Sequence, residues 1–167
     1  AILYKCDADG GNIRRLSANV ETESTPAVMP DGRVIFMRWE YVHRGVMAFH
    51  HLWTINPDGT GQMTFFGNMH DEGYVGLRKN VLMTEPSPIP GTDKVSAVFC
   101  DTHGRQEHRG HVVVLDSKGG PDAPQRAVRI TDSFPGHPDP GFNIPTEAWR
   151  DPYPLSEDCF LVASHRS

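Results

Sequence analysis

The stretch NPDGTGQMTFF, residues 56–66, repeats in outline the stretch DADGGNIRRL, residues 7–16. In both, a turn rich in Asp and Gly follows a β-prone run and precedes alternating polar and apolar residues. A third equivalent is VVVLDSKGG, residues 112–120, which RAVRITD at 126–132 follows with the same alternation. Turns of Asp-Gly and Gly-Gly accept positive φ angles at low cost and join the strands of β-hairpins. The three stretches therefore predict equivalent hairpins in a repetitive chain.

A second motif alternates with these hairpins. It combines a short strand that carries proline, a tight polar turn and a strongly β-prone run. Its three copies are TPAVMPDGRVIFMRWE at 25–40, PSPIPGTDKVSAVFCDTH at 86–103 and DPYPLSEDCFLVASH at 151–165. The motifs recur at a distance of roughly 50 to 65 residues, which is typical of four-stranded propeller blades with long loops.

We therefore predict an all-β fold of β-propeller blades, each a sheet of four antiparallel strands named A to D. The chain reads as strands C-D, A-B-C-D, A-B-C-D and A-B, about three blades' worth. A closed ring usually needs about four to eight blades, so we expect part of a larger propeller. Within the single unit 1–167, the predicted parts are a half blade at 1–17, blades at 25–66 and 85–132, and a half blade at 149–164.

The expected strands follow from these motifs. Prolines gather on strand A, where a ladder donor is not required, so each strand A is expected to begin near its proline. The ranges are Ile2–Cys6, Ile13–Leu16, Pro26–Met29, Val34–Trp39, Leu52–Ile55, Gln62–Phe65, Glu85–Ile89, Val95–Cys100, His111–Leu115, Ala127–Thr131, Pro152–Leu155 and Cys159–Ala163.

The composition excludes several classes of function. The 167 residues suffice for one domain, and 16 glycines with 14 prolines suit short strands joined by turns. A net charge of −5 argues against binding to nucleic acid or to an anionic membrane surface. No apolar run approaches the roughly 18 to 20 residues that cross a bilayer. Cys6, Cys100 and Cys159 lie among β-prone residues, and we interpret them as small buried hydrophobic residues of strands.

At the level of the repeat, the sequence resembles a known family. LYKCDADGGNIRRLS followed by TPAVMPDGRVIFMRW resembles the TolB-type, or PD40, β-propeller repeat, which is also described as WD40-like. LWTINPDGTGQMTFFGN, PIPGTDKVSAVF and DPYPLSEDCFLVAS are similar to propeller segments of proteins like the hydrazine synthase alpha subunit, which are large and exported. The resemblance implies a periplasmic or otherwise exported location. The Cys-x-x-Cys-His motif that attaches haem is absent from this chain, so the resemblance carries no redox chemistry to these residues.

Nine histidines fall on connections that we expect at one end of the blades. In a propeller, the B–C and D–A connections surround the mouth of the central channel, and long loops on a rigid frame often form binding sites. We interpret this end as a face for a protein partner, a neighbouring domain or another ligand. The predicted face comprises His43, Arg44, His50, His51, His70 and His137.

One loop at that end is a candidate metal site. His103, Glu107, His108 and His111 lie close in sequence, and imidazole and carboxylate groups bind divalent transition metals. The spacing matches no standard zinc motif, so solvated loop histidines remain the alternative interpretation. No other cofactor is expected.

No catalytic residues are predicted, because the sequence contains no recognisable group of nucleophile, base and oxyanion donors. Arg150 and Asp151 are interpreted as a pair that fixes a loop or joins two blades, and Trp39, Trp53 and Trp149 as packing residues. The favoured function is a non-catalytic propeller scaffold or interaction module. The alternative is the propeller part of a large exported redox enzyme similar to the hydrazine synthase alpha subunit. Half propellers of two copies could also associate with each other.

Overall fold

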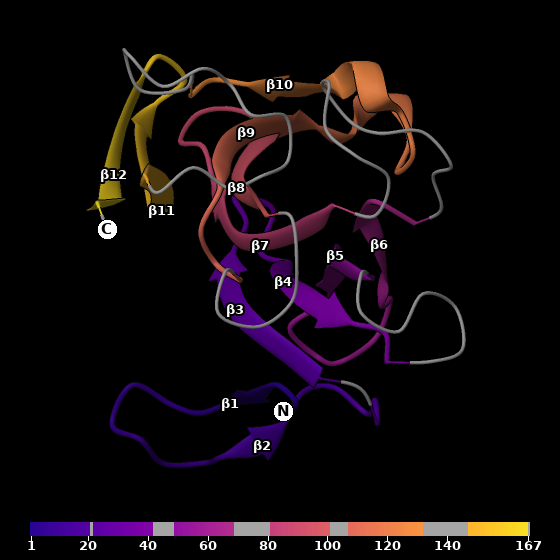
Figure 1. The fold of residues 1–167 in the computed structure, drawn as a ribbon. Coiled ribbons are helices and arrows are strands. Elements are labelled where there is room, and N and C mark those ends of the chain that lie inside the picture. Colours follow the sequence, from indigo (N-terminus) through magenta and orange to yellow (C-terminus); the bar gives the residue numbers. More distant parts are fainter. Residues whose placement is uncertain (21, 42–48, 69–80, 101–106, 132–146, 167) are drawn as a thin grey trace.

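The computed structural model consists of antiparallel sheets arranged side by side (Figure 1). It describes residues 1–20, 22–41, 49–68, 81–100, 107–131 and 147–166. Two sheets have four strands each and two have two strands each, in the order C-D, A-B-C-D, A-B-C-D, A-B that the sequence predicts. The all-β prediction is confirmed, and none of the described residues forms a helix able to span a membrane.

The strands and short helices of the described residues have the following bounds. The first half blade is β1 (Tyr4–Lys5) and β2 (Arg14–Arg15), and the last is β11 (Glu147–Ser156) and β12 (Cys159–Arg166). The first complete blade is β3 (Thr22–Val28), β4 (Val34–Trp39), β5 (His50–Ile55) and β6 (Met63–Phe66). The second complete blade is β7 (Leu82–Pro88), β8 (Lys94–Cys100), β9 (His111–Asp116) and β10 (Ala127–Arg129), with the 3₁₀ turns η1 (Ser117–Gly119) and η2 (Pro124–Arg126) before β10.

Each strand A begins earlier than its proline suggests. Pairing starts at Thr22 in β3, at Leu82 in β7 and at Glu147 in β11, three to five residues before the expected starts. The prolines therefore lie inside these strands, and the ladder shifts register where each proline occurs. A bulge at this point leaves out the hydrogen bond that proline cannot donate.

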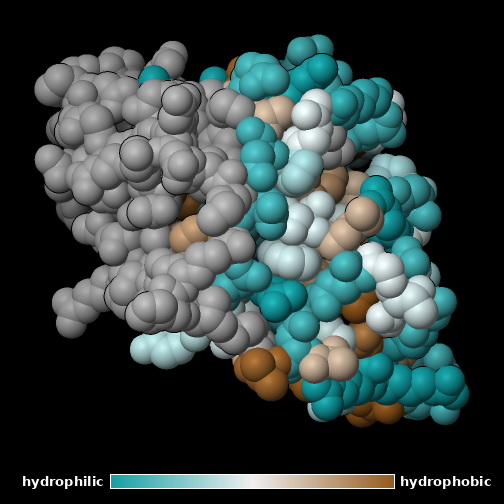
Figure 2. All heavy atoms as spheres, turned by 90° about the vertical axis from the view of Figure 1, so that its right-hand side faces the viewer, coloured by the Kyte–Doolittle hydropathy of each residue, from teal (hydrophilic) through white to brown (hydrophobic). Residues whose placement is uncertain are grey.

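The two half blades lie at opposite ends of the arc of sheets. Figure 1 places β11 and β12 at the upper left and β1 and β2 at the bottom, and no described strand pairs one half blade with the other. Both leave large apolar side chains exposed, among them Ile13 and Leu161. In Figure 2, the coloured part of the surface that faces the viewer is mostly hydrophilic, with apolar atoms toward the lower end.

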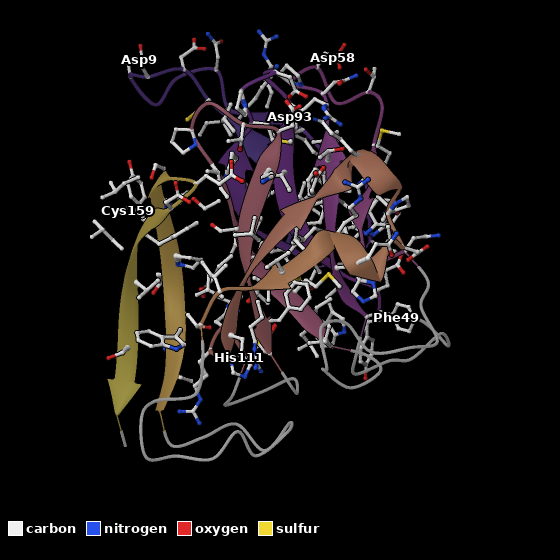
Figure 3. All side chains as sticks on the ribbon, turned by 90° about the horizontal axis from the view of Figure 1, so that it is seen from above. Asp9, Phe49, Asp58, Asp93, His111 and Cys159 are labelled. Carbon is white, nitrogen blue, oxygen red and sulfur yellow. The ribbon has the colours of Figure 1, made fainter. Side chains whose placement is uncertain are left out.

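The blades have two chemically different ends. In Figure 3, the turn residues Asp9, Asp58 and Asp93 lie at one end, which we call the hairpin end. Phe49 and His111, which precede or begin a strand C, lie toward the opposite end, which we call the loop end. The structure thus separates the tight A–B and C–D turns from the B–C connections, as the sequence predicts.

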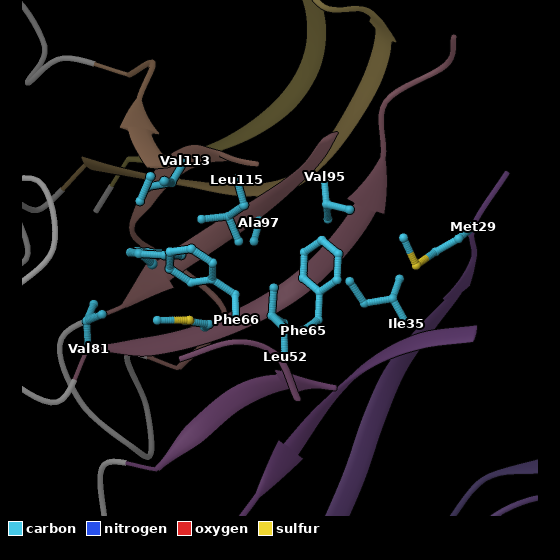
Figure 4. Close-up of a cluster of buried hydrophobic side chains, with 13 residues drawn as sticks. Met29, Ile35, Leu52, Phe65, Phe66, Val81, Val95, Ala97, Val113 and Leu115 are labelled. Atoms are coloured by element: carbon cyan, nitrogen blue, oxygen red, sulfur yellow. The ribbon is translucent and has the colours of Figure 1, made fainter. Parts of the chain in front are cut away.

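Most of the core lies between the two complete blades (Figure 4). Ile35, Leu52 and Phe65 of the first complete blade pack with Val95 and Leu115 of the second, and all five are buried. Fully burying one such side chain stabilises a protein by about 1.5–3 kcal/mol, so this interface fixes the two sheets relative to each other.

A smaller cluster joins the first half blade to the first complete blade. It consists of Leu3 and Leu16 with Phe36 and Ile55, and the half-buried Trp53 packs against it. The Arg38 guanidinium lies 4.4 Å from the centre of the Trp53 ring, a cation–π contact. The interpretation of Trp53 as a packing residue is confirmed.

The cysteines do not behave alike. Cys100 is buried on β8, as expected, but Cys6 and Cys159 are exposed, so their interpretation as buried residues is wrong. Cys6 follows β1 and Cys159 begins β12, and each of these strands belongs to a two-stranded sheet. An apolar pattern on a strand predicts burial only when a neighbouring sheet covers that face.

Candidate functional site

Strands β3, β7 and β11, the strand A of each described blade that has one, carry the same unusual backbone feature. Thr25, Glu85 and Asp151 each precede a proline and have φ angles of 51°, 53° and 47°. Left-handed φ is uncommon for residues other than glycine and costs on the order of 1 kcal/mol or more. Because the left-handed residue recurs at the equivalent bulge of β3, β7 and β11, it is a regular feature of the repeat.

These three bulges meet at a shallow hollow between the sheets. Its lining includes Thr25, Glu85 and Asp151, the three prolines that follow them and Tyr153. The residues come from β3, β7 and β11, so strand A of every described blade that has one contributes to a single surface.

Glu85 is the hub of a polar cluster that extends from the bulge in the middle of β7 toward the loop end. Its Oε2 accepts a 2.7 Å hydrogen bond from the backbone N–H of Asp151, and its Oε1 lies 3.2 Å from Nδ1 of His108. Arg150 donates through Nε to the carbonyl oxygen of His108 at 3.1 Å. The left-handed turn at Glu85 thus joins β7, the residues before β9 and β11.

A second carboxylate extends the cluster to the first complete blade. Nδ1 of His50, on β5, lies 2.9 Å from Oε1 of Glu107, and the same oxygen lies 3.8 Å from Nε2 of His108. His50 has no exposed side-chain surface, and its ring centre lies 4.9 Å from that of Trp39. A continuous line of polar contacts therefore runs across three sheets.

Backbone contacts fix the same region. Gly110 and Trp149 exchange two hydrogen bonds of 3.0 Å, which bind the start of β9 to β11. A Cβ atom on Gly110 would lie 2.0 Å from the carbonyl oxygen of Phe99, far inside van der Waals contact. Only glycine allows the chain to pass this close, so the base of the second B–C connection depends on Gly110.

The electrostatics of the cluster favour a protonated imidazole. The hydrogen bond to Glu85 raises the pKa of His108, burial opposes this, the charges of Glu85 and Glu107 raise the pKa further, and Arg150 lowers it. By contrast, burial raises the pKa of the Cys100 thiol to about 12, and the sulfur lies 3.6 Å from Oγ1 of Thr84. The Cys100 thiol stays protonated at neutral pH and is a poor nucleophile.

The structure changes the interpretation of two predicted face residues. His50 and His51 are strand residues of β5 and are buried, so their assignment to a loop is wrong. Strand C begins two residues earlier than expected because His50 pairs with Trp39. Because both side chains are buried, they do not belong to an exposed partner face. His50 instead takes part in the polar cluster. The other members of the predicted face, His43, Arg44, His70 and His137, lie outside the described residues.

The predicted metal ligands are only partly described. Glu107 and His108 lie together in the polar cluster, His111 begins β9 opposite Phe99, and His103 lies outside the described residues. Within the described ranges, no group of three or more His, Cys, Asp or Glu side chains is arranged to hold a metal ion. The four-residue metal site therefore stays a prediction.

Reasoning from sequence missed Glu85. Glu85 was expected at the start of a strand. The pattern that could have indicated its role is a residue followed by proline in each strand A, at Thr25-Pro26, Glu85-Pro86 and Asp151-Pro152. The interpretation of Arg150 and Asp151 as residues that join blades is confirmed, but each binds a residue of the preceding blade and not the other.

The comparisons with known proteins agree with the geometry. No protein-family model and no curated protein matches this sequence. Among solved structures, hydrazine synthase of Kuenenia stuttgartiensis superposes on 91% of this chain with a TM-score of 0.67 and 19% identity. A putative TolB from Agrobacterium tumefaciens superposes on 80% with a TM-score of 0.56 and 23% identity. Both relatives are β-propeller proteins.

The blades are those of a β-propeller. The predicted likeness to TolB and hydrazine synthase is therefore confirmed for the fold. This chain covers 18% of the hydrazine synthase chain and 42% of the TolB chain, so it spans less than half the length of either. At these identities the comparison describes the propeller frame and leaves the activity to be argued from the site.

Proposed function

We propose that this chain is a non-catalytic β-propeller module that presents the loop end of its blades to a protein partner or a neighbouring domain. The observation that carries the proposal is the polar cluster that extends from the bulges of strand A to that end. In this cluster, buried and half-buried groups from three sheets contact one another and hold the bases of the long connections in place. A rigid base under long connections is the usual way in which a fold supports a variable binding surface.

The contacts within the cluster favour a structural role over a catalytic one. His50 and His108 each face a carboxylate of the protein itself, and Glu85 also accepts a backbone hydrogen bond. Their acid–base groups are thus engaged in contacts between sheets. The hollow beside them is shallow, whereas enzyme pockets usually bury most of a small substrate.

A second candidate function is favoured by the superposition on hydrazine synthase, which extends over most of this chain. In this case the propeller belongs to a larger exported redox enzyme, where it shapes a channel or docks a haem domain that another part supplies. An exported or periplasmic location is part of both candidates, and the likeness to TolB supports it. Cys-x-x-Cys-His motifs in sequence adjoining residues 1–167 would favour the second candidate.

The first candidate can be tested by photo-crosslinking from the two ends. A benzophenone amino acid replaces Tyr41, which is exposed at the loop end, or Asp93, which is exposed at the hairpin end. In the native host, we expect discrete protein adducts from position 41 and few from position 93. Replacing residues 42–48 by two glycines should remove the adducts while the protein keeps its circular dichroism spectrum. Equal adducts from both ends, or adducts that survive the shortening, would contradict the proposal.

A further inference from the structure

Two arginines lie side by side at the base of the second B–C connection. Gly110 and Trp149 form an antiparallel pair through two backbone hydrogen bonds. In such a pair, the residue before one partner lies opposite the residue after the other, and these two residues project to the same face. Arg109 therefore lies opposite Arg150, and both side chains are half-buried.

Neither guanidinium has a carboxylate partner among the described residues. Nε of Arg109 is buried, and no hydrogen-bond partner for it is found in this part of the chain. Nε of Arg150 donates to the carbonyl oxygen of His108. The ion pairs that the described residues form include neither arginine.

This arrangement is unfavourable unless a further group completes it. Like charges opposite each other on paired strands repel, and a buried donor without a partner has lost its hydrogen bonds to water. At the hairpin end the protein pairs such charges, as Arg33 with Asp31 and Arg126 with Asp116. A buried open donor between two equal charges therefore indicates a site for an anion.

We propose that Arg109 and Arg150 form a carboxylate-binding site, and that its ligand is an Asp or Glu side chain of the partner or neighbouring domain that docks on the loop end. This inference rests on the function proposed above, because it names the chemistry by which that end recognises its partner. Figure 3 places His111, two residues after Arg109, toward the loop end. The site thus lies at the base of the proposed docking face.

The fold holds the site in place before a ligand binds. The hydrogen bonds between Gly110 and Trp149 are both 3.0 Å long, and Nε of Arg150 lies 3.1 Å from the His108 carbonyl oxygen. This contact orients the Arg150 guanidinium, and none of the hydrogen bonds among the described residues engages its two terminal nitrogens. A guanidinium that is already oriented loses less entropy when it binds.

The neighbouring charges favour a carboxylate over a phosphate. Oε1 of Glu85 lies 3.2 Å from Nδ1 of His108, and Oε1 of Glu107 lies 3.8 Å from Nε2 of the same ring. Because His108 directly precedes Arg109, both carboxylates lie near the site. A carboxylate binds a guanidinium through two parallel hydrogen bonds with a single negative charge. The second charge of a phosphate adds repulsion from Glu85 and Glu107.

An acetate titration of the whole chain tests the site without its partner. In ¹⁵N-labelled protein, the Nε–H signals of the arginines are followed while acetate replaces chloride at constant ionic strength, which keeps general screening unchanged. We expect the Arg109 signal to shift and to saturate, with half-saturation at roughly 10 mM acetate. Phosphate should bind at least about threefold more weakly.

The internal control is Arg33, whose Nε already donates to Asp31 at 2.8 Å. Its signal should not move with acetate. No shift at Arg109, an equal shift at Arg33, or binding of phosphate as strong as that of acetate would each overturn the proposal.

Arg109→Gln is the decisive variant. It removes one charge and one fork of donors, so acetate binding, followed on the Arg150 signal, should weaken at least about tenfold. Arg109→Lys keeps the charge without the fork and should restore part of the affinity. Without acetate, the melting temperature of Arg109→Gln should not fall, because the substitution relieves repulsion from Arg150. A lower melting temperature would show that Arg109 stabilises the fold and would overturn its role as an open ligand site.

Crosslinking distinguishes this inference from the proposed function. With benzophenone at position 41, Arg109→Gln should reduce the protein adducts at least about fivefold, whereas Arg33→Gln should not. Undiminished adducts in Arg109→Gln would overturn the carboxylate contact and leave the loop-end function standing. If position 41 gives no adducts without these changes, the loop-end function fails, and the acetate shift alone decides whether the two arginines bind a carboxylate.

Discussion

The two ends of the blades are held together in different ways. At the hairpin end, carboxylates of the turns accept from the backbone of their own turn, as Asp58 does from the N–H of Thr60 and Asp31 from that of Arg33. The contacts that cross between sheets at this end, such as Lys94 with Glu157, are exposed and contribute little. From the bulges in the middle of each strand A toward the loop end, the partners are distant in sequence and mostly buried, as in the hydrogen bond from Asp151 to Glu85 across 66 positions. A turn at the hairpin end can form as soon as its own strands do, whereas the loop end requires neighbouring blades.

The strongest test of this difference is a change at Gly110. Gly110→Ala would push a methyl group into the Phe99 carbonyl and break the paired hydrogen bonds to Trp149. Because the obstacle is backbone, the chain must shift, and we expect a loss of about 3 kcal/mol or more in the free energy of unfolding. Urea denaturation followed by tryptophan fluorescence measures it.

Gly91→Ala at the hairpin end provides the control. Gly91 also has a positive φ angle, 74°, but a Cβ there would meet no atom within 4 Å. The substitution should cost only the backbone strain, about 1–2 kcal/mol. Equal losses at positions 91 and 110 would show that the two ends do not differ in the way proposed.

The next largest effect should come from Glu85. Glu85→Gln keeps the shape of the side chain but removes the charge that faces His108 at the bulge. The carboxylate is mostly buried, so we expect a loss of about 1–2 kcal/mol near pH 6 in the same denaturation measurement. Asp93→Asn breaks the exposed pair with Lys118 at the hairpin end and should have no measurable effect. An effect at Asp93 as large as that at Glu85 would contradict the comparison.

The pH dependence of stability distinguishes the ends further. The pKa of His108 is raised in the folded state, mainly by its hydrogen bond to Glu85. The stabilisation is then fully present below the unfolded pKa of about 6.5 and is lost as the pH rises through the folded pKa. Glu107 adds to this effect, and Arg150 opposes it.

His108→Gln should therefore destabilise the protein more at about pH 6 than at about pH 8.5, with a difference below about 1 kcal/mol. The Glu85→Gln and His108→Gln effects should also be non-additive at the lower pH, because the two side chains share one contact. A loss that is the same at both pH values would show that His108 acts only through packing.

The sequence predicted the hairpin end well because its signals are local. Asp-Gly turns and period-two alternation specify a hairpin within about ten residues, and the expected Val34–Trp39 strand matches β4 at both ends. Strand A was misplaced at its start because proline was taken as a strand boundary. In the structure, a left-handed residue such as Glu85 allows the proline to lie within the strand. The residue type alone does not indicate this conformation.

The polar cluster was less predictable for a related reason. His50 was expected in a loop because polar residues collect there, but a carboxylate from another blade, Glu107, compensates its burial. Such a partner becomes visible only after the blades are packed. The exposed cysteines show the converse, since Cys6 and Cys159 lie on half blades whose outer faces no described sheet covers.

The smallest effect should come from the turn at Asp58. Its carboxylate accepts hydrogen bonds from the N–H of Thr60 at 2.9 Å and from Oγ1 of Thr60 at 2.7 Å, which lower the pKa of Asp58. A lowered carboxyl pKa contributes stability above the unfolded value of about 3.9 that is lost as the pH falls through the folded value. Asp58→Ala should therefore lower the melting temperature at neutral pH and leave it unchanged in acid, where the Asp58 contribution is already lost. The decrease at neutral pH should be only about 1–2 °C, because the turn is exposed and Gly59 and Gly61 keep its backbone conformation. A loss comparable to that of Glu85→Gln would mean that this turn, too, is coupled to the packing of the blades, and the contrast between local and cross-blade ends would fail.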